Sequence, residues 1–138
     1  MKEVSSVFFV LFGNIHHEYL KKGEGQDASK VLAAIQISTL IGLNLMSASF
    51  LLSSLVNSGM MQIFEASRIK VFLIMITFIG LNTFLIIKFY RWDEVQQERY
   101  FKVLRSDDSK WIKLLARIIP YITMGLFVAA MALGIALN

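Results

Sequence analysis

The sequence lacks cysteine altogether and contains a single proline in 138 residues. The absence of cysteine excludes disulfides, a thiol nucleophile and thiolate metal ligands. With one proline, the chain is neither collagen-like nor a proline-rich disordered segment. Charged residues are also scarce, because they make up 17% of the chain, whereas soluble domains carry about 25%. Hydrophobic residues reach 56%, so the composition indicates one membrane domain covering residues 1–138.

Three long segments without charge predict an all-α integral membrane protein with three transmembrane helices. The charge-free runs are residues 31–56, 71–87 and 118–138. A helix of about 20 residues crosses the hydrocarbon core, and a helix satisfies its own backbone hydrogen bonds there. With their flanking residues, the spans are expected at 31–58, 69–90 and 114–138.

Residues 1–30 predict an N-terminal interfacial helix followed by a turn. The apolar run 7–12 is too short to span the membrane, and no small-residue cleavage site follows it. We expect its Phe and Val side chains to enter the headgroup boundary while Lys21 and Lys22 face phosphates. A re-entrant half-helix is the alternative. Residues 23–27 form the expected turn, and Asp27 or Ser29 is expected to cap the first span.

The basic residues are unevenly distributed, and their distribution predicts the orientation. Residues 1–30 and 88–117 hold 12 of the 14 lysines and arginines, whereas Arg68 and Lys70 are the two between the first and second spans. The positive-inside rule therefore places the N-terminus and the 88–117 loop in the cytoplasm. The C-terminus is then outside.

The loop at 91–113 contains no Gly or Pro, so helix is expected to continue beyond the membrane, with a break at 106–109. Spans two and three would then extend into a cytoplasmic helical hairpin. Aromatic residues alternate with basic ones along this loop, which admits two interpretations. One is a ligand site for a nucleotide or oligonucleotide, formed by Arg91, Trp92, Arg99, Lys102 and Arg105. The other is an aromatic belt and positive anchor, with Trp92 and Trp111 at matching depths.

No catalytic motif is recognisable in the sequence. The metal-capable residues His16, His17 and Glu18 are adjacent, and neighbouring side chains point to different faces of a helix or strand. No Gly-rich phosphate loop or nucleophile elbow occurs, and the three spans hold no carboxylate that would suggest proton coupling. We therefore expect neither an enzyme nor a metal or cofactor site.

The first span is unusually polar for a helix in lipid. A stripe about 140° wide collects seven polar residues at 100° per residue: Gln36, Thr39, Asn44, Ser47, Ser54, Asn57 and Ser58. We call these seven residues the polar stripe. It either lines a water-filled pore, which requires several chains, or packs in a dry helix–helix interface.

The layout resembles that of small bacterial membrane proteins, among them antiphage channel effectors of the Hailong type. The features that carry the resemblance are the apolar N-terminal run 7–12, the polar first span 36–58 and the aromatic–basic loop 88–111. The resemblance implies a homo-oligomeric channel in the bacterial inner membrane, gated by a nucleic-acid-like ligand on the cytoplasmic side. We take four chains as the working stoichiometry.

The sequence therefore favours a homo-oligomeric ion channel or membrane-disrupting effector whose first span lines the pore. Its partners would be the lipid bilayer, further copies of itself and a nucleotide-like ligand in antiphage defence. The alternative is a non-conducting accessory or scaffold subunit of a larger membrane complex.

Overall fold

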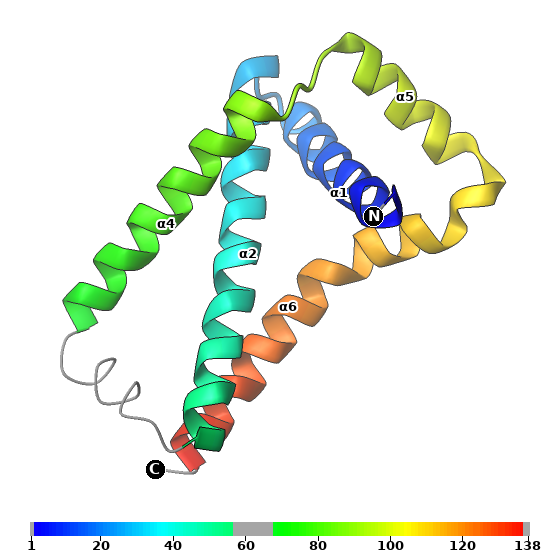
Figure 1. The fold of residues 1–138 in the computed structure, drawn as a ribbon. Coiled ribbons are helices and arrows are strands. Elements are labelled where there is room, and N and C mark those ends of the chain that lie inside the picture. Colours follow the sequence, from blue (N-terminus) through cyan, green and yellow to red (C-terminus); the bar gives the residue numbers. More distant parts are fainter. Residues whose placement is uncertain (1, 57–67, 137–138) are drawn as a thin grey trace.

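The computed structural model describes residues 2–56 and 68–136, which fold into helices joined by short connections (Figure 1). In chain order these are α1 (Lys2–Lys21), α2 (Gln26–Val56), α4 (Arg68–Phe89), α5 (Glu94–Arg105), the 3₁₀ turn η1 (Asp107–Ser109) and α6 (Lys110–Ala136). No strand occurs in these ranges. The all-α prediction is confirmed.

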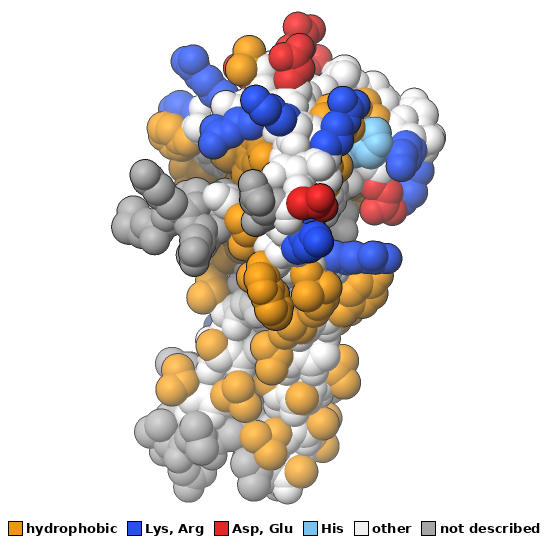
Figure 2. Space-filling model, turned by 90° about the vertical axis from the view of Figure 1, so that its right-hand side faces the viewer, with side chains coloured by type: hydrophobic (Ala, Val, Ile, Leu, Met, Phe, Trp, Pro, Cys, Tyr) orange, Lys and Arg blue, Asp and Glu red, His pale blue; other side chains and the backbone are white. Residues whose placement is uncertain are grey.

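Three of the helices are long and apolar enough to cross a membrane: α2, α4 and α6. Helix α2 lies at the centre and packs against both α4 and α6, while α1 and α5 sit together at one end of the bundle (Figure 1). Charged side chains gather at this end, and hydrophobic ones cover the other part of the surface (Figure 2). The three predicted spans are confirmed as apolar helices.

Helix α4 is the least covered of the three, because it packs mainly on α2. At Gly42 of α2 the Phe78 ring of α4 lies within ordinary van der Waals distance of a Cβ, at 3.6 Å. The outward face of α4 leaves large apolar side chains exposed, among them Phe72 and Ile74. Such a face suits lipid or another apolar surface.

Helix α1 forms where it was predicted, but its apolar side chains do not face outward. Val10, Leu11 and Phe12 are buried against the rest of the chain, together with Ile15 and His16. They form the core of the charged end, where α1 packs on α2 and α6. The expectation that residues 7–12 present their Phe and Val side chains to headgroups is therefore wrong for these buried positions.

The absence of Gly and Pro predicted that the second span would continue as helix beyond the membrane. This prediction is wrong, because α4 and α5 are separate helices. Helix α4 ends at Phe89, and residues 90–93 are non-helical. The extended backbone of Asp93 begins α5, and its carboxylate accepts a hydrogen bond from the Gln96 amide at 3.0 Å. This N-cap and the burial of Trp92 outweigh helix propensity. The predicted break at 106–109 is observed, since α5 ends at Arg105.

The start of α2 also differs from the prediction. The helix begins at Gln26, and the Ser29 amide donates to the Gly25 carbonyl at 2.9 Å. Asp27 and Ser29 therefore lie inside the first turn rather than at the cap. Asp27 still faces the positive end of the helix dipole, which favours a carboxylate. The preceding turn is closed by Gly23 with a φ of 90°, a conformation that glycine adopts without strain.

Candidate functional site

Trp92 is the centre of an aromatic cluster that joins α1 to the α4–α5 connection. Its ring lies 5.4 Å from Phe9, 5.0 Å from Phe12 and 5.7 Å from His16, measured between centroids. Tyr90 and Tyr100 complete the cluster around the indole. Each such pair stabilises by about 0.5–1.5 kcal/mol beyond its area. Trp92 is only 5% exposed, so it packs as a core residue in this chain.

Helix α5 is fixed to α1 through Tyr100. The phenol donates a hydrogen bond of 2.6 Å to Asn14 Oδ1, and the ring lies directly over Gly13. A Cβ at position 13 would come within 2.3 Å of Tyr100 Cδ2. At the C-terminal end of α5, the Lys113 ammonium donates to the carbonyls of Leu104 and Ser106. The middle and the C-terminal end of α5 are therefore tied to other helices.

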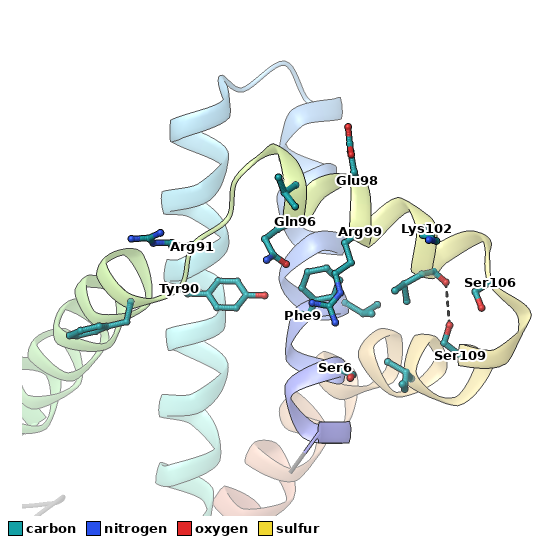
Figure 3. A pocket seen from close by; sticks show the side chains of 15 residues that line it. Ser6, Phe9, Tyr90, Arg91, Gln96, Glu98, Arg99, Lys102, Ser106 and Ser109 are labelled. Carbon is teal, nitrogen blue, oxygen red and sulfur yellow. Dashed lines mark hydrogen bonds between the residues drawn. The ribbon is translucent and has the colours of Figure 1, made fainter.

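An open cavity of about 1500 Å³ lies beneath α5, which we call the α5 cavity (Figure 3). Side chains from α1, the end of α4, the α4–α5 connection, α5 and the start of α6 surround it. Its polar and charged lining residues are Ser6, Tyr90, Arg91, Gln96, Glu98, Arg99, Lys102, Ser106 and Ser109. The apolar part of the wall includes Phe9, Val10 and Ile112. The cavity thus combines an aromatic and aliphatic wall with a basic rim.

The structure brings together three of the five predicted ligand residues. Arg91, Arg99 and Lys102 line the α5 cavity, whereas Trp92 and Arg105 do not. The Arg99 guanidinium lies 5.6 Å from the Phe9 ring centroid, a cation–π distance. None of the three cations forms an ion pair with another residue in the described ranges. Their charge is available to an anion in the cavity.

Phe9 and Tyr90 belong to this site but were not predicted as site residues. Phe9 comes from α1, about eighty residues before the lining residues at 89–112, and no sequence pattern connects the two segments. The only available signal was the shared richness in aromatic rings of the N-terminal run and the loop. Tyr90 lies just before the loop in which aromatic and basic residues alternate, and its hydroxyl is buried and has no hydrogen-bond partner in the described residues.

Burial shifts the titration of the groups in the cluster. It raises the pKa of Tyr100 to about 12 and raises the pKa of Tyr90 further, although the Arg99 charge opposes the second shift. Burial lowers the pKa of His16. A backbone hydrogen bond at Gln26 opposes this shift, and the nearby charges of Lys30 and His17 add to it. His16 stacks on Phe12, whereas His17 contacts Phe101. The two histidines therefore have separate environments.

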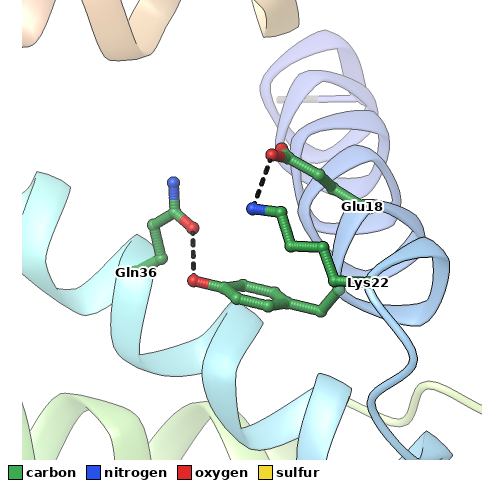
Figure 4. Close-up of polar contacts among 4 residues, drawn as sticks. Glu18, Lys22 and Gln36 are labelled. Carbon is green, nitrogen blue, oxygen red and sulfur yellow. Dashed lines mark hydrogen bonds and ion pairs between the residues drawn. The ribbon is translucent and has the colours of Figure 1, made fainter.

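The polar stripe of α2 is partly closed by contacts within the chain. Tyr19 donates a hydrogen bond of 3.2 Å to Gln36 Oε1, beside the ion pair between Glu18 of α1 and Lys22, which follows this helix (Figure 4). Asn44 Nδ2 donates to Thr123 Oγ1 of α6 at 3.1 Å. Ser47 is buried, and its hydroxyl donates to the Leu43 carbonyl. These three members of the stripe have partners inside the monomer.

The same stripe also borders a groove of about 400 Å³ between α2 and α6. Gln36 and Thr39 line it on α2, and Pro120 and Met124 line it on α6. Asn44, farther along α2, stays exposed despite its hydrogen bond. The side chain of Ser54 and the residues Asn57 and Ser58 lie outside the described part of the structure.

The charged end thus holds an aromatic–basic cavity that reaches two apolar helices, while α2 presents a half-closed polar stripe to a groove. Comparison of the chain with known protein families, curated proteins and solved structures finds no match.

Proposed function

We propose that the protein is a homo-oligomeric channel or membrane-disrupting effector in which α2 faces the conduction path. One observation carries the proposal: α2 keeps polar groups open to its surroundings in the middle of an apolar helix. Thr39 lines the groove beside α6, and Asn44 is exposed. In lipid such groups are costly, so contact with water or with a neighbouring copy is favourable.

A cyclic arrangement satisfies this requirement, because each chain then covers the exposed helix surface of its neighbour. Three helices are too few to enclose and shield an aqueous path, so conduction needs several copies. Four chains are the working stoichiometry. The apolar outward face of α4 fits the lipid-facing side of such a ring.

The orientation follows from the basic residues, of which 12 of 14 lie in 1–30 and 88–117. We place the charged end formed by α1 and α5 in the cytoplasm and the C-terminus outside. In a bacterial inner membrane, the α5 cavity would then be open to a nucleotide-like ligand produced in the cell. Because the cavity is lined by the end of α4 and the start of α6, a ligand there contacts two spans at once.

The second candidate is an accessory subunit that does not conduct, and a different observation favours it. Three polar residues of α2 have partners on other helices of the same chain: Gln36 with Tyr19, Asn44 with Thr123, and Ser38 with Thr83. A dry interface of this kind needs no pore. The remaining exposed surface would then pack against a different membrane protein.

The test compares leucine substitutions on α2 and α4 after reconstitution into planar bilayers. Thr39→Leu and Asn44→Leu are expected to lower unitary conductance, because apolar constrictions expel water. Thr77→Leu is the matched control, since Thr77 is an exposed polar residue on α4 whose hydroxyl donates to the Leu73 carbonyl of its own helix. It is expected to leave conductance unchanged.

Oligomer size is measured in parallel by crosslinking in native membranes. A defined oligomer with current that responds to the α2 substitutions supports the channel. Monomers alone at ordinary expression, or a stable oligomer without current in any cytoplasmic ligand tried, would overturn it in favour of the accessory subunit.

A further inference from the structure

The α5 cavity lies where two apolar helices reach the charged end of the molecule. Helix α4 ends at Phe89, and α6 begins at Lys110. Beside these ends, Phe89 is 73% exposed and Trp111 is 74% exposed. Exposed aromatic residues at such positions are typical of the headgroup level of a membrane. Phe89 and Ile112 also line the cavity, so its wall extends to this level.

The charges in the cavity favour an anion. Arg91, Arg99 and Lys102 line it together with one carboxylate, that of Glu98, which leaves a surplus of two positive charges (3 − 1). Guanidinium groups bind phosphate oxygens in a bidentate manner, and lysine adds a compact charge.

The apolar wall and the volume point to an amphipathic ligand. Phe9, Val10 and Ile112 line the cavity together with the polar groups. Its volume of about 1500 Å³ exceeds the roughly 300–1,000 Å³ of sites that hold drug-sized molecules. A free inorganic anion would leave most of this space and the apolar wall without contact.

We propose that the α5 cavity is a phosphate-ester binding site in which Arg99 and Lys102 hold the phosphate. Two sources share this chemistry, an anionic phospholipid headgroup and a soluble nucleotide. The cavity lies at the ends of two spans, and this position favours the phospholipid. Its glycerol and upper acyl chain then contact Phe9 and Ile112. The inference rests on the proposed function only for placing the charged end at a membrane surface, and it does not require conduction.

The experiment measures ligand-dependent thermal stability of the full-length protein in a neutral detergent, so that binding is read without current. Three probes are compared: short-chain phosphatidylglycerol, short-chain phosphatidylcholine and ATP. Stabilisation by phosphatidylglycerol above that by phosphatidylcholine identifies the lipid source. Stabilisation by ATP without a lipid effect identifies the soluble source. Equal effects of the two lipids together with no effect of ATP would overturn the site.

A matched pair of variants assigns the binding to the cavity. Arg99→Gln removes a lining cation, and Arg105→Gln removes the same charge from the same helix outside the cavity. Arg99→Gln is expected to weaken the apparent affinity about tenfold, as for a lost charged hydrogen bond. Arg105→Gln is expected to stay within about twofold, because unspecific surface attraction is weak.

Equal weakening by both variants would overturn the proposal in favour of general attraction to a basic surface. Circular dichroism and elution volume confirm that each variant is folded before binding is compared. The current measured for the α2 substitutions is a separate readout, so a failed channel and a failed phosphate site are distinguishable.

Discussion

Gly13 is the residue on which the docking of α5 depends most directly. The Tyr100 ring covers it so closely that Gly13→Ala must displace the ring or the helix, even though alanine suits a helix better than glycine. We expect a loss of about 1–3 kcal/mol in the free energy of unfolding, as for other overpacked sites. Denaturation in detergent measures it.

Gly80→Ala is the control for this substitution, because a Cβ at Gly80 meets nothing within 4 Å. It is expected to be neutral or to stabilise by up to about 1 kcal/mol through helix propensity. If both variants behave alike, the close contact between Tyr100 and Gly13 does not limit stability.

His16 gives the charged end a dependence on pH. Its side chain is 2% exposed, and burial lowers its pKa below the ordinary 6.5. The unfolded chain therefore takes up a proton near pH 6.5, whereas the folded chain does so only at lower pH. The contribution of His16 to the free energy of unfolding is therefore fully present above pH 6.5. It decreases as pH falls below that value toward the pKa of the folded state, by at most about 1.4 kcal/mol per pH unit.

Thermal unfolding at pH 7.5 and 5.5 checks this dependence. His16→Gln should flatten it, while His17→Gln, which keeps the buried imidazole, should retain it. If the pH dependence disappears with His17→Gln and survives His16→Gln, His16 is not its source and the prediction is wrong.

At the scale of elements, the connection between α4 and α5 is held by one buried side chain. Removing the indole in Trp92→Ala leaves a cavity among Phe9, Phe12 and Tyr100, so we expect a loss of about 3–5 kcal/mol. Trp111→Ala removes the same group from a position that is 74% exposed, and it should change stability by about 0.5 kcal/mol or less. Equal losses would contradict the core role of Trp92.

The same connection marks where sequence reasoning stopped being sufficient. Uninterrupted hydrophobic runs predicted the three apolar helices, because length and the absence of charge depend only on local sequence. Residues 90–93 contain no Gly or Pro, so the local sequence does not predict the break. It arises from a tertiary contact, the insertion of Trp92 beside Phe12 and His16, together with the Asp93 cap.

Helix α1 and the α5 cavity were also predicted only in part from the sequence. The run 7–12 predicted a helix with an apolar face, but nothing in the sequence said which surface would cover that face. Five residues of the loop were predicted as one ligand site, and the structure gathers three of them, Arg91, Arg99 and Lys102, at one cavity. The contribution of Phe9 depends on packing between distant segments, so only the fold reveals it.

At the scale of the whole molecule, polarity is divided along the bundle. The charged end carries α1, α5 and the aromatic cluster, and the apolar helices extend away from it (Figures 1 and 2). Coupling between a ligand and the spans would pass through the α4–α5 connection and the α5–α6 turn, where Lys113 binds the last carbonyls of α5. Both junctions border the α5 cavity.

This division makes the membrane orientation testable with single thiols, because the native chain contains no cysteine. Gln97 lies on α5, where its side chain donates to Gln26 near the surface. Gln97→Cys should react with a membrane-impermeant maleimide only from the cytoplasmic side, since 12 of the 14 basic residues lie in the two segments on that side. Gln62→Cys, in the segment between α2 and α4 that the structure does not describe, should react only from outside.

Ser38→Cys is the control for accessibility, because Ser38 is fully buried and its hydroxyl donates to the Ala34 carbonyl. It should react from neither side. Labelling of Gln97→Cys from outside would reverse the orientation and place the α5 cavity beyond the reach of any ligand made in the cell.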